Sequence, residues 1–322
     1  MNFTGMIPQK NPSERNVALK DLPDCLRKDH PDFPPSPAPQ PEKGPWVWKV
    51  DHTPSRLYAL LDMARIHLKG GDFYKEVLAK IRFFSHTPLV DDNPKYEVLK
   101  PYAAWLVYGN DAALLDKLGG CDSDIVSAWL ISEIEPRELI AHFKQATFIY
   151  DAKDKAFLLR YHDPLITPVL HRLADPAWVK WFFGPFIAWW YPVSSPTQES
   201  WSRIAGGGQA QSHAKVKHVL TEELEDAVYK DPLPYHILNT SEQQHPPAVF
   251  EGCCYGVRLA KVEDLLEKGR KHGLKTSEDL TTYVLTLLET PEIEKDERWQ
   301  AALRKTVAGQ APLQPIEQTI RD

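Results

Sequence analysis

Short apolar runs alternate with helix-like segments through the first half of the chain, and this alternation is the strongest constraint on its fold. The apolar runs have the length of strands and cover Trp46–Val50, Leu57–Asp62, Ala104–Tyr108, Ile125–Ser132, Thr147–Asp151 and Ala156–Tyr161. Helix-like segments between them cover Asp72–Ile81, Asp111–Gly120 and Pro136–Gln145. Strands that alternate with helices favour an α/β layer with a mainly parallel sheet. The last two runs are joined by a short polar stretch typical of an antiparallel hairpin, so we predict a mixed sheet.

The last third of the chain has a helical pattern. Apolar residues recur at helical spacing before Gly273, a residue that commonly ends a helix. Thr276 and Asp279 resemble a capping box at the start of the next helix. A last helix is expected over Asp296–Val307. We therefore predict an α-helical lobe after the α/β lobe.

Proline and glycine mark the expected boundaries. Ten of the 28 prolines fall in residues 1–50, which favours an extended arm or, alternatively, a disordered spacer. Serines and the run Gly206–Gly208 indicate a flexible linker before the helical pattern. The predicted organisation is a proline-rich extended arm (1–45), an α/β lobe (46–195), a linker (196–215) and an α-helical lobe (216–322).

Charge and composition exclude several classes of partner. The formal net charge is −6 and the pI is about 6.1, so neither nucleic acid nor an anionic membrane is an expected partner. The longest uncharged apolar stretch, Trp181–Val193, has 13 residues, whereas a membrane-spanning helix needs about 20. The N-terminus does not resemble a secretory signal, and four cysteines do not suggest a disulfide framework. We expect a cytoplasmic protein.

Catalytic and cofactor motifs are not found in the sequence. It has no zinc-binding spacing, nucleophile elbow or phosphate-binding glycine loop, so we expect no metal and no cofactor. Asp62 and Asp163 follow apolar runs, where α/β enzymes often place acids, and His162 is a possible acid or base. The structural alternative is that Asp163 caps the helix that Pro164 begins, while Arg160 or Arg65 pairs with a carboxylate. We favour this structural interpretation.

Aromatic residues are concentrated between Trp178 and Tyr191. Large aromatic side chains either fill a core or anchor a protein partner, and both interpretations remain open here. The candidate partner-binding residues are Trp178, Trp181, Phe182, Phe186, Trp189, Trp190 and Tyr191.

Several short motifs in a fixed order resemble the type VI secretion effector chaperones, an adaptor family also called Tap or TEC and first named as a domain of unknown function. The motifs are Tyr58–Ala64, Pro101-Tyr102, Leu106-Val107, Trp129–Ser132, Leu139-x-x-His142-Phe143, Leu159–Pro164 and Phe183-Gly184-Pro185. They lie within residues 56–192. His162 stands where the family usually has an aromatic residue, and Leu165 where it has an arginine.

The resemblance implies a non-catalytic bacterial adaptor that binds a secreted toxin effector and helps load it onto the VgrG spike protein. It also implies structural roles for Tyr58, Asp62, Arg160, Asp163, Pro164, Gly184 and Pro185. We hypothesise that Asp62, Arg160 and Asp163 set the fold of the α/β lobe. Two alternatives remain, an enzyme that uses Asp62, His162 and Asp163, and an immunity protein that neutralises a toxin.

Overall fold

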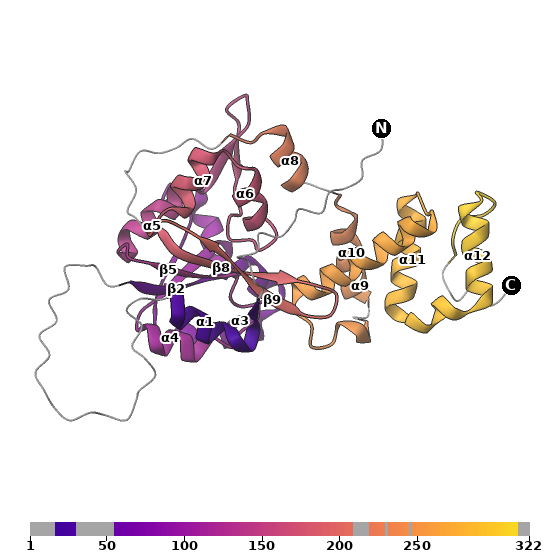
Figure 1. Ribbon diagram of the computed structural model, residues 1–322, viewed down its shortest axis with the longest axis horizontal. Helices are drawn as coiled ribbons and strands as arrows, with labels where there is room; N and C mark the ends of the chain where they lie inside the picture. The colour runs from indigo at the N-terminus through magenta and orange to yellow at the C-terminus, as the bar shows by residue number, and fades with distance from the viewer. Residues whose placement is uncertain (1–16, 30–54, 209–218, 229–230, 245–246, 315–322) are drawn as a thin grey trace, which may run out of the picture. The chain divides into compact units, whose positions relative to one another are not determined.

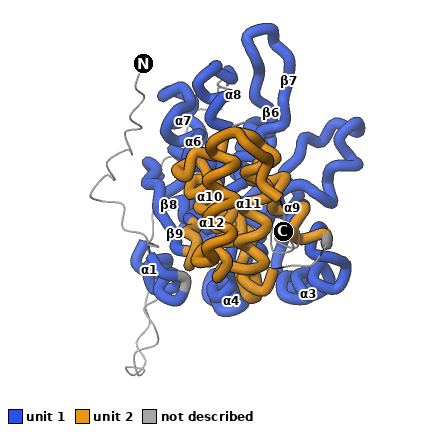
Figure 2. Tube along the Cα trace, turned by 90° about the vertical axis from the view of Figure 1, so that its right-hand side faces the viewer, with its two compact units in different colours: residues 1–193, 200–228 blue, residues 194–199, 229–322 orange. Residues whose placement is uncertain are grey.

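The computed structural model describes residues 17–29, 55–208, 219–228, 231–244 and 247–314. The chain divides into two compact units, shown in different colours in Figure 2. The first contains residues 1–193 and 200–228, and the second contains residues 194–199 and 229–322. The predicted α/β lobe followed by an α-helical lobe is confirmed.

A sheet of seven strands, counted over the described residues, forms the centre of the first unit. In spatial order its strands are β1 (Val17–Ala18), β9 (Glu199–Ala205), β8 (Phe186–Ser194), β5 (Ala128–Ser132), β2 (Arg56–Asp62), β4 (Ala104–Tyr108) and β3 (Ser85–Pro88). A separate pair is formed by β6 (Phe148–Tyr150) and β7 (Ala156–Leu158).

Helices cover both faces of this sheet (Figure 1). One face carries α1 (Leu22–Asp29), α2 (Met63–Leu68), α3 (Gly71–Ile81) and α4 (Asp111–Leu118). The other face carries α5 (Pro136–Gln145), α6 (Thr167–Leu173), α7 (Pro176–Phe183) and α8 (Glu222–Val228). Short 3₁₀ segments are η1 (Leu19–Asp21) and η2 (Pro94–Tyr102).

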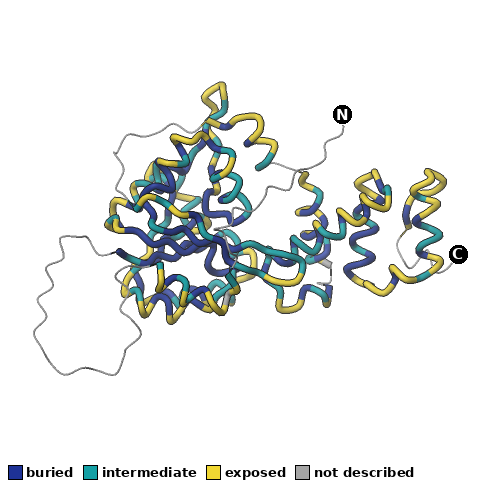
Figure 3. The backbone as a smooth tube through the Cα atoms, viewed as in Figure 1, coloured by how far each residue is buried: buried dark blue, intermediate teal, exposed yellow. Residues whose placement is uncertain are grey.

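The buried strand β2 shows why two cores form. Side chains alternate along a strand, so Leu57, Ala59 and Leu61 join the core with α1–α4, whereas Tyr58 and Leu60 join the other core. All five are 0% exposed. Figure 3 shows the central strands as buried and the outer faces of the helices as exposed. A nearly continuous apolar run is therefore the sequence signature of a strand covered on both faces.

The strand directions differ from the mixed sheet that the sequence suggested. The registered ladders between β1 and β9, β2 and β4, β2 and β5, β3 and β4, and β5 and β8 are all antiparallel. The pair β6 and β7 is an antiparallel hairpin, as predicted. A helix between two strands can connect them in parallel, but it does not have to. The second strand can also run antiparallel to the first.

Residues 17–29 form part of the first unit rather than an extended arm. Leu22 and Leu26 of α1 are 0% exposed, and Asp29 accepts hydrogen bonds from Trp190 Nε1 (2.9 Å) and Arg203 Nε (2.6 Å). Pro23 occupies the first helical turn, where its missing N–H costs no hydrogen bond. The prediction of an extended arm is wrong for these residues, and the rest of the predicted arm lies outside the described residues.

Residues 199–205, predicted as part of the linker, form strand β9. Trp201 and Ile204 are 0% and 2% exposed, so this serine-containing segment contributes to both cores. The glycines after β9 also lie against the body of the first unit, because Gly208 N donates to Phe186 O (3.1 Å). The prediction of a flexible linker is therefore wrong for Gly206–Gly208. Helix α8, predicted in the helical lobe, groups with the first unit.

We expect Gly206→Ala to lower the free energy of unfolding by about 1–3 kcal/mol, because overpacking forces the backbone to move. A methyl group at this position would overlap the carbonyl oxygens of Phe183 and Phe186. Urea unfolding measures the change. The matched control is Gly207→Ala, whose methyl would lie 3.5 Å from Gly184 O in ordinary contact. Equal stability of the two variants would contradict the prediction.

The second unit is helical. It comprises α9 (Leu233–Gln244), η3 (Ala248–Phe250), α10 (Tyr255–His272), α11 (Ser277–Glu289), η4 (Pro291–Lys295) and α12 (Glu297–Val307). The predicted helix end is confirmed at Gly273, which has a φ of 98° in the left-handed region that favours glycine. Within the described part of the chain, no helix has the length and apolar character needed to cross a membrane.

Candidate functional site

Asp62 lies at the point where strand β2 ends and helix α2 begins. Its side chain is 2% exposed. Its Oδ1 atom accepts hydrogen bonds from the backbone N–H groups of Ala64 (3.1 Å) and Arg65 (3.3 Å). These amides have no partner inside the helix, so an aspartate here satisfies them. The carboxylate thus joins the strand to the helix and fixes the start of α2.

Two arginines connect Asp62 with Asp163, and we call these four residues the Asp62 network. Arg160 Nη2 lies 2.8 Å from Asp62 Oδ2, and Arg65 Nη2 lies 2.9 Å from Asp163 Oδ1. Each arginine also approaches the other carboxylate at 3.5 Å. Two positive and two negative charges balance inside the network. The structure therefore brings together the three residues that we hypothesised to set the fold, together with Arg65.

Asp163 also shapes the chain before helix α6. Its Oδ1 atom accepts a hydrogen bond from Leu165 N (3.1 Å), and its carbonyl oxygen accepts from Ile166 N and Thr167 N, both at 2.9 Å. The prediction that Asp163 caps a helix beginning at Pro164 is wrong, because residues 164–166 form a turn and helix α6 starts only at Thr167, after Ile166 and without a side-chain cap. The Asp163 side chain instead holds this turn through Leu165 N.

His162 is the third polar residue that the sequence singled out, and it lies beside this network. It is 9% exposed, and its Nε2 atom lies 3.8 Å from Asp62 Oδ2, which is too far for a hydrogen bond. Burial lowers the pKa of His162, and the nearby Asp62 opposes this effect only in part. We therefore assign a neutral imidazole at pH 7.

The pKa of Asp62 shifts in the direction that keeps it charged. Burial alone would raise this pKa, but the protonated form of His162 at acid pH, the charges of Arg160 and Arg65 and the backbone hydrogen bond from Arg65 outweigh burial and hold it below its ordinary value. Asp62 is therefore ionised at neutral pH and is already held by both arginines. This arrangement suits a fixed structural anion better than a general acid.

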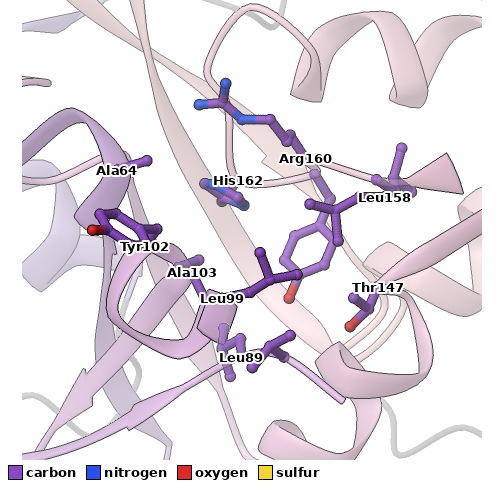
Figure 4. A pocket seen from close by; sticks show the side chains of 13 residues that line it. Ala64, Leu89, Leu99, Tyr102, Ala103, Thr147, Leu158, Arg160 and His162 are labelled. Atoms are coloured by element: carbon purple, nitrogen blue, oxygen red, sulfur yellow. The ribbon is translucent and has the colours of Figure 1, made fainter. Parts of the chain in front are cut away.

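A pocket of about 220 Å³ lies next to the Asp62 network. Figure 4 shows Arg160 and His162 at one end of it and Leu89 at the other. Apolar side chains from four separate segments form most of the wall, among them Ala64, Leu89, Leu99, Tyr102 and Leu158. The polar residues of the wall are Thr147, Arg160, Tyr161 and His162. The pocket thus combines an apolar interior with a cation at one end.

The described residues hold no group of three or more histidine, cysteine or carboxylate side chains arranged to bind a metal. The pocket also lacks the glycine-rich turn that holds the phosphates of a nucleotide. Its chemistry is that of a binding pocket for an apolar group with an adjacent hydrogen-bond acceptor or anion.

The predicted aromatic anchor surface is buried. Trp178, Trp181, Phe182, Phe186, Trp189, Trp190 and Tyr191 are between 0% and 7% exposed. Their rings pack on one another, as for Trp178 and Phe182, which stack at 4.7 Å between ring centroids. Six of the seven lie in the core with α5–α8, and Trp190 lies in the opposite core. The core interpretation is the one that the structure supports, and these residues offer no exposed surface to a partner.

The remaining motif residues hold the same unit together. Tyr58 is fully buried, and its hydroxyl donates to Ile134 O at 2.7 Å. Ser132 Oγ donates to Pro185 O at 2.8 Å, and Gly184 N donates to Lys180 O at 3.0 Å to end α7. Pro164 is buried in the turn before α6. These contacts agree with the structural roles that the resemblance implied.

Residues 57–179 match a family model described as a domain of unknown function (DUF4123). The matched segment contains the whole Asp62 network and every residue that lines the pocket. No curated protein and no solved structure matches the chain.

Sequence reasoning did not identify the pocket. Tyr102 and Tyr161 occur in the motifs that carry the family resemblance, but Leu99 and Leu158 carry no chemical signal of their own. Their role depends on the fold, because η2, β7 and the start of α2 meet only in three dimensions.

Proposed function

We propose that the protein is a non-catalytic adaptor chaperone of a type VI secretion system. In this proposal it binds a toxin effector in the cytoplasm of the producing bacterium and helps load it onto the VgrG spike. The observation that carries the proposal is the position of the DUF4123 match. It covers residues 57–179, within the segment 56–192 that carries the resemblance to the effector chaperones.

The geometry of the Asp62 network supports a binding role over a catalytic one. Both carboxylates are held by arginines, and Asp62 also caps helix α2. A catalytic carboxylate needs a free lone pair near a reacting atom, whereas this network fixes the wall of an apolar pocket. Apolar pockets with a few polar groups are common sites for protein and small-molecule recognition.

A tagged full-length chain, purified from its own bacterium under gentle conditions, tests the proposal. We expect a secreted toxin to co-purify in stoichiometric amount, as determined by mass spectrometry and light scattering. The purified pair should then bind VgrG in a separate pull-down, because a loading adaptor must deliver its cargo. The control is the same purification with an unrelated tagged protein.

Three outcomes would contradict the adaptor proposal. Recovery of a monomer without a partner would remove its central claim. A complex in which the toxin is inhibited and VgrG does not bind would favour the immunity alternative. Turnover of a small molecule that is lost in a folded His162→Ala variant would favour the enzyme alternative.

A further inference from the structure

We propose that the pocket beside the Asp62 network receives one apolar side chain of a partner protein, with a neighbouring acidic residue of that partner paired to Arg160. That the occupant is a protein segment rests on the adaptor function proposed above. The pocket itself is inferred from geometry alone.

The size of the pocket fits one side chain. Its volume is about 220 Å³, and an engineered apolar cavity of about 150 Å³ is large enough to bind benzene. A leucine, methionine or phenylalanine side chain therefore fits, whereas a helix or a folded element does not. The apolar wall residues favour such an occupant over a polar one.

The rim of the pocket exposes large apolar side chains. Tyr102 and Leu158 line the pocket and are 54% and 50% exposed, respectively. Side chains of this size are usually covered in a folded protein, and a tyrosine at a pocket edge is a frequent contact in protein interfaces. An inserted side chain and its flanking backbone would cover both residues.

Arg160 supplies the charge complement. Its side chain is 45% exposed, and its contacts with Asp62 and Asp163 both use Nη2. A guanidinium has five N–H donors in a fixed fork, so donors on Nε and Nη1 remain for a further carboxylate. Arg65 also pairs with Asp62 and Asp163, so these aspartates do not depend on Arg160 alone. An aspartate or glutamate of the partner beside the apolar anchor fits this end of the pocket.

Methyl NMR of the full-length chain tests the proposal with a defined probe, acetyl-Asp-Leu-amide. We expect saturable shifts of the methyl groups of Leu99, Ala103 and Leu158, which line the pocket, with a dissociation constant in the millimolar range. Acetyl-Asn-Leu-amide and acetyl-Asp-Ser-amide should each bind about tenfold more weakly, because they lack the charge or the apolar group.

Two variants localise the binding. Ala103→Phe fills the pocket from a partly exposed wall position and should weaken the probe at least about tenfold. The matched control Ala112→Phe, on the exposed side of α4, should not change the affinity.

Three results would overturn the pocket proposal. The first is the absence of saturable methyl shifts up to about 10 mM probe. The second is unchanged affinity of Ala103→Phe for the probe. The third is binding of hexanoate without binding of the peptide. If the wild type captures an effector and Ala103→Phe captures it equally, the pocket proposal fails and the adaptor function stands. If the peptide binds as expected and no effector is captured, the adaptor function fails and the pocket stands.

Discussion

Asp62→Ala should lower the free energy of unfolding of the first unit by about 3–5 kcal/mol, the usual cost of removing one partner from a buried ion pair. The substitution leaves Arg65, which is 12% exposed at its side chain, without its partner at Asp62. It also removes the hydrogen-bond acceptor for two amides at the start of α2. Urea unfolding followed by tryptophan fluorescence measures the loss, since the cores of this unit are rich in tryptophan.

Asp175→Ala is the matched control for this prediction. Asp175 caps α7 through Ala177 N (2.8 Å) and Trp178 N (3.2 Å), as Asp62 caps α2, but it is exposed. Loss of a cap alone costs about 1 kcal/mol. The difference between the two variants therefore isolates the buried charges. If Asp62→Ala costs no more than Asp175→Ala, the Asp62 network does not stabilise the fold.

Arg160→Ala should cost less than Asp62→Ala. The Arg160 side chain is 45% exposed, and Arg65 still neutralises Asp62 when Arg160 is absent. Unchanged stability of Arg160→Ala, together with unchanged partner binding, would count against the hypothesis that this residue helps to set the fold.

Low pH should remove the contribution of ionised Asp62 to the free energy of unfolding. The folded state lowers the pKa of this carboxyl below 3.8, so its stabilisation is complete above 3.8 and is lost as the pH falls through the folded-state pKa. Wild type and Asp62→Asn should therefore become more alike in stability at low pH. A constant difference across the acid range would contradict this assignment.

Local signals in the sequence predicted the helix ends well. Thr276 accepts a hydrogen bond from Asp279 N (3.1 Å) at the start of α11, as its capping box predicted. Asp296 caps α12 in the same way, and Pro136 is the first residue of α5. These features depend on a few neighbouring residues, so the sequence contains nearly all the information needed.

Strand direction was harder to predict, because it depends on distant contacts. Strand β3, with the sequence Ser-His-Thr-Pro, has no apolar run and pairs only through the register of Thr87 with Leu106 and its neighbours. Strand β9 resembles a linker in composition, yet Trp201 is fully buried. In both cases the partner strand supplies the hydrogen bonds and the packing that make the segment a strand.

In the candidate site, too, local pairing could be predicted from the sequence, whereas burial could not. The sequence suggested that Arg160 or Arg65 pairs with a carboxylate, and the structure confirms both pairs. The aromatic segment was open to two interpretations, because Trp and Phe are suited to cores and to interfaces alike. Burial decides between them, and burial is a property of the whole fold.

A drop in pH should destabilise the first unit through His142. This partly buried side chain packs against Trp181, with 4.5 Å between the ring centroids, and its Nε2 atom donates to Phe182 O at 3.0 Å. Burial lowers the pKa of His142 from 6.5 to about 4, and the hydrogen bond to Phe182 opposes this shift only in part. The folded state thus holds a neutral imidazole that the unfolded chain protonates more readily.

The direction of this change in stability follows from proton binding. Below pH 6.5 the unfolded state binds the proton first, so the stabilisation present above 6.5 is lost as the pH falls towards 4. The loss due to His142 should reach about 2 kcal/mol between about pH 7.5 and about pH 5. Urea unfolding at the two pH values measures it. His142→Gln keeps an N–H donor for Phe182 O and should lose that much less stability over the same interval.

His86→Gln serves as the matched control for the exchange of histidine for glutamine itself, because His86 is exposed on strand β3. His162 contributes to the acid response of all three proteins, since burial also lowers its pKa. The comparison therefore rests on the difference between His142→Gln and the wild type. An identical pH profile for these two proteins would show that the imidazole is protonated equally well in the folded and unfolded states. Its position in the aromatic core would then impose no electrostatic cost.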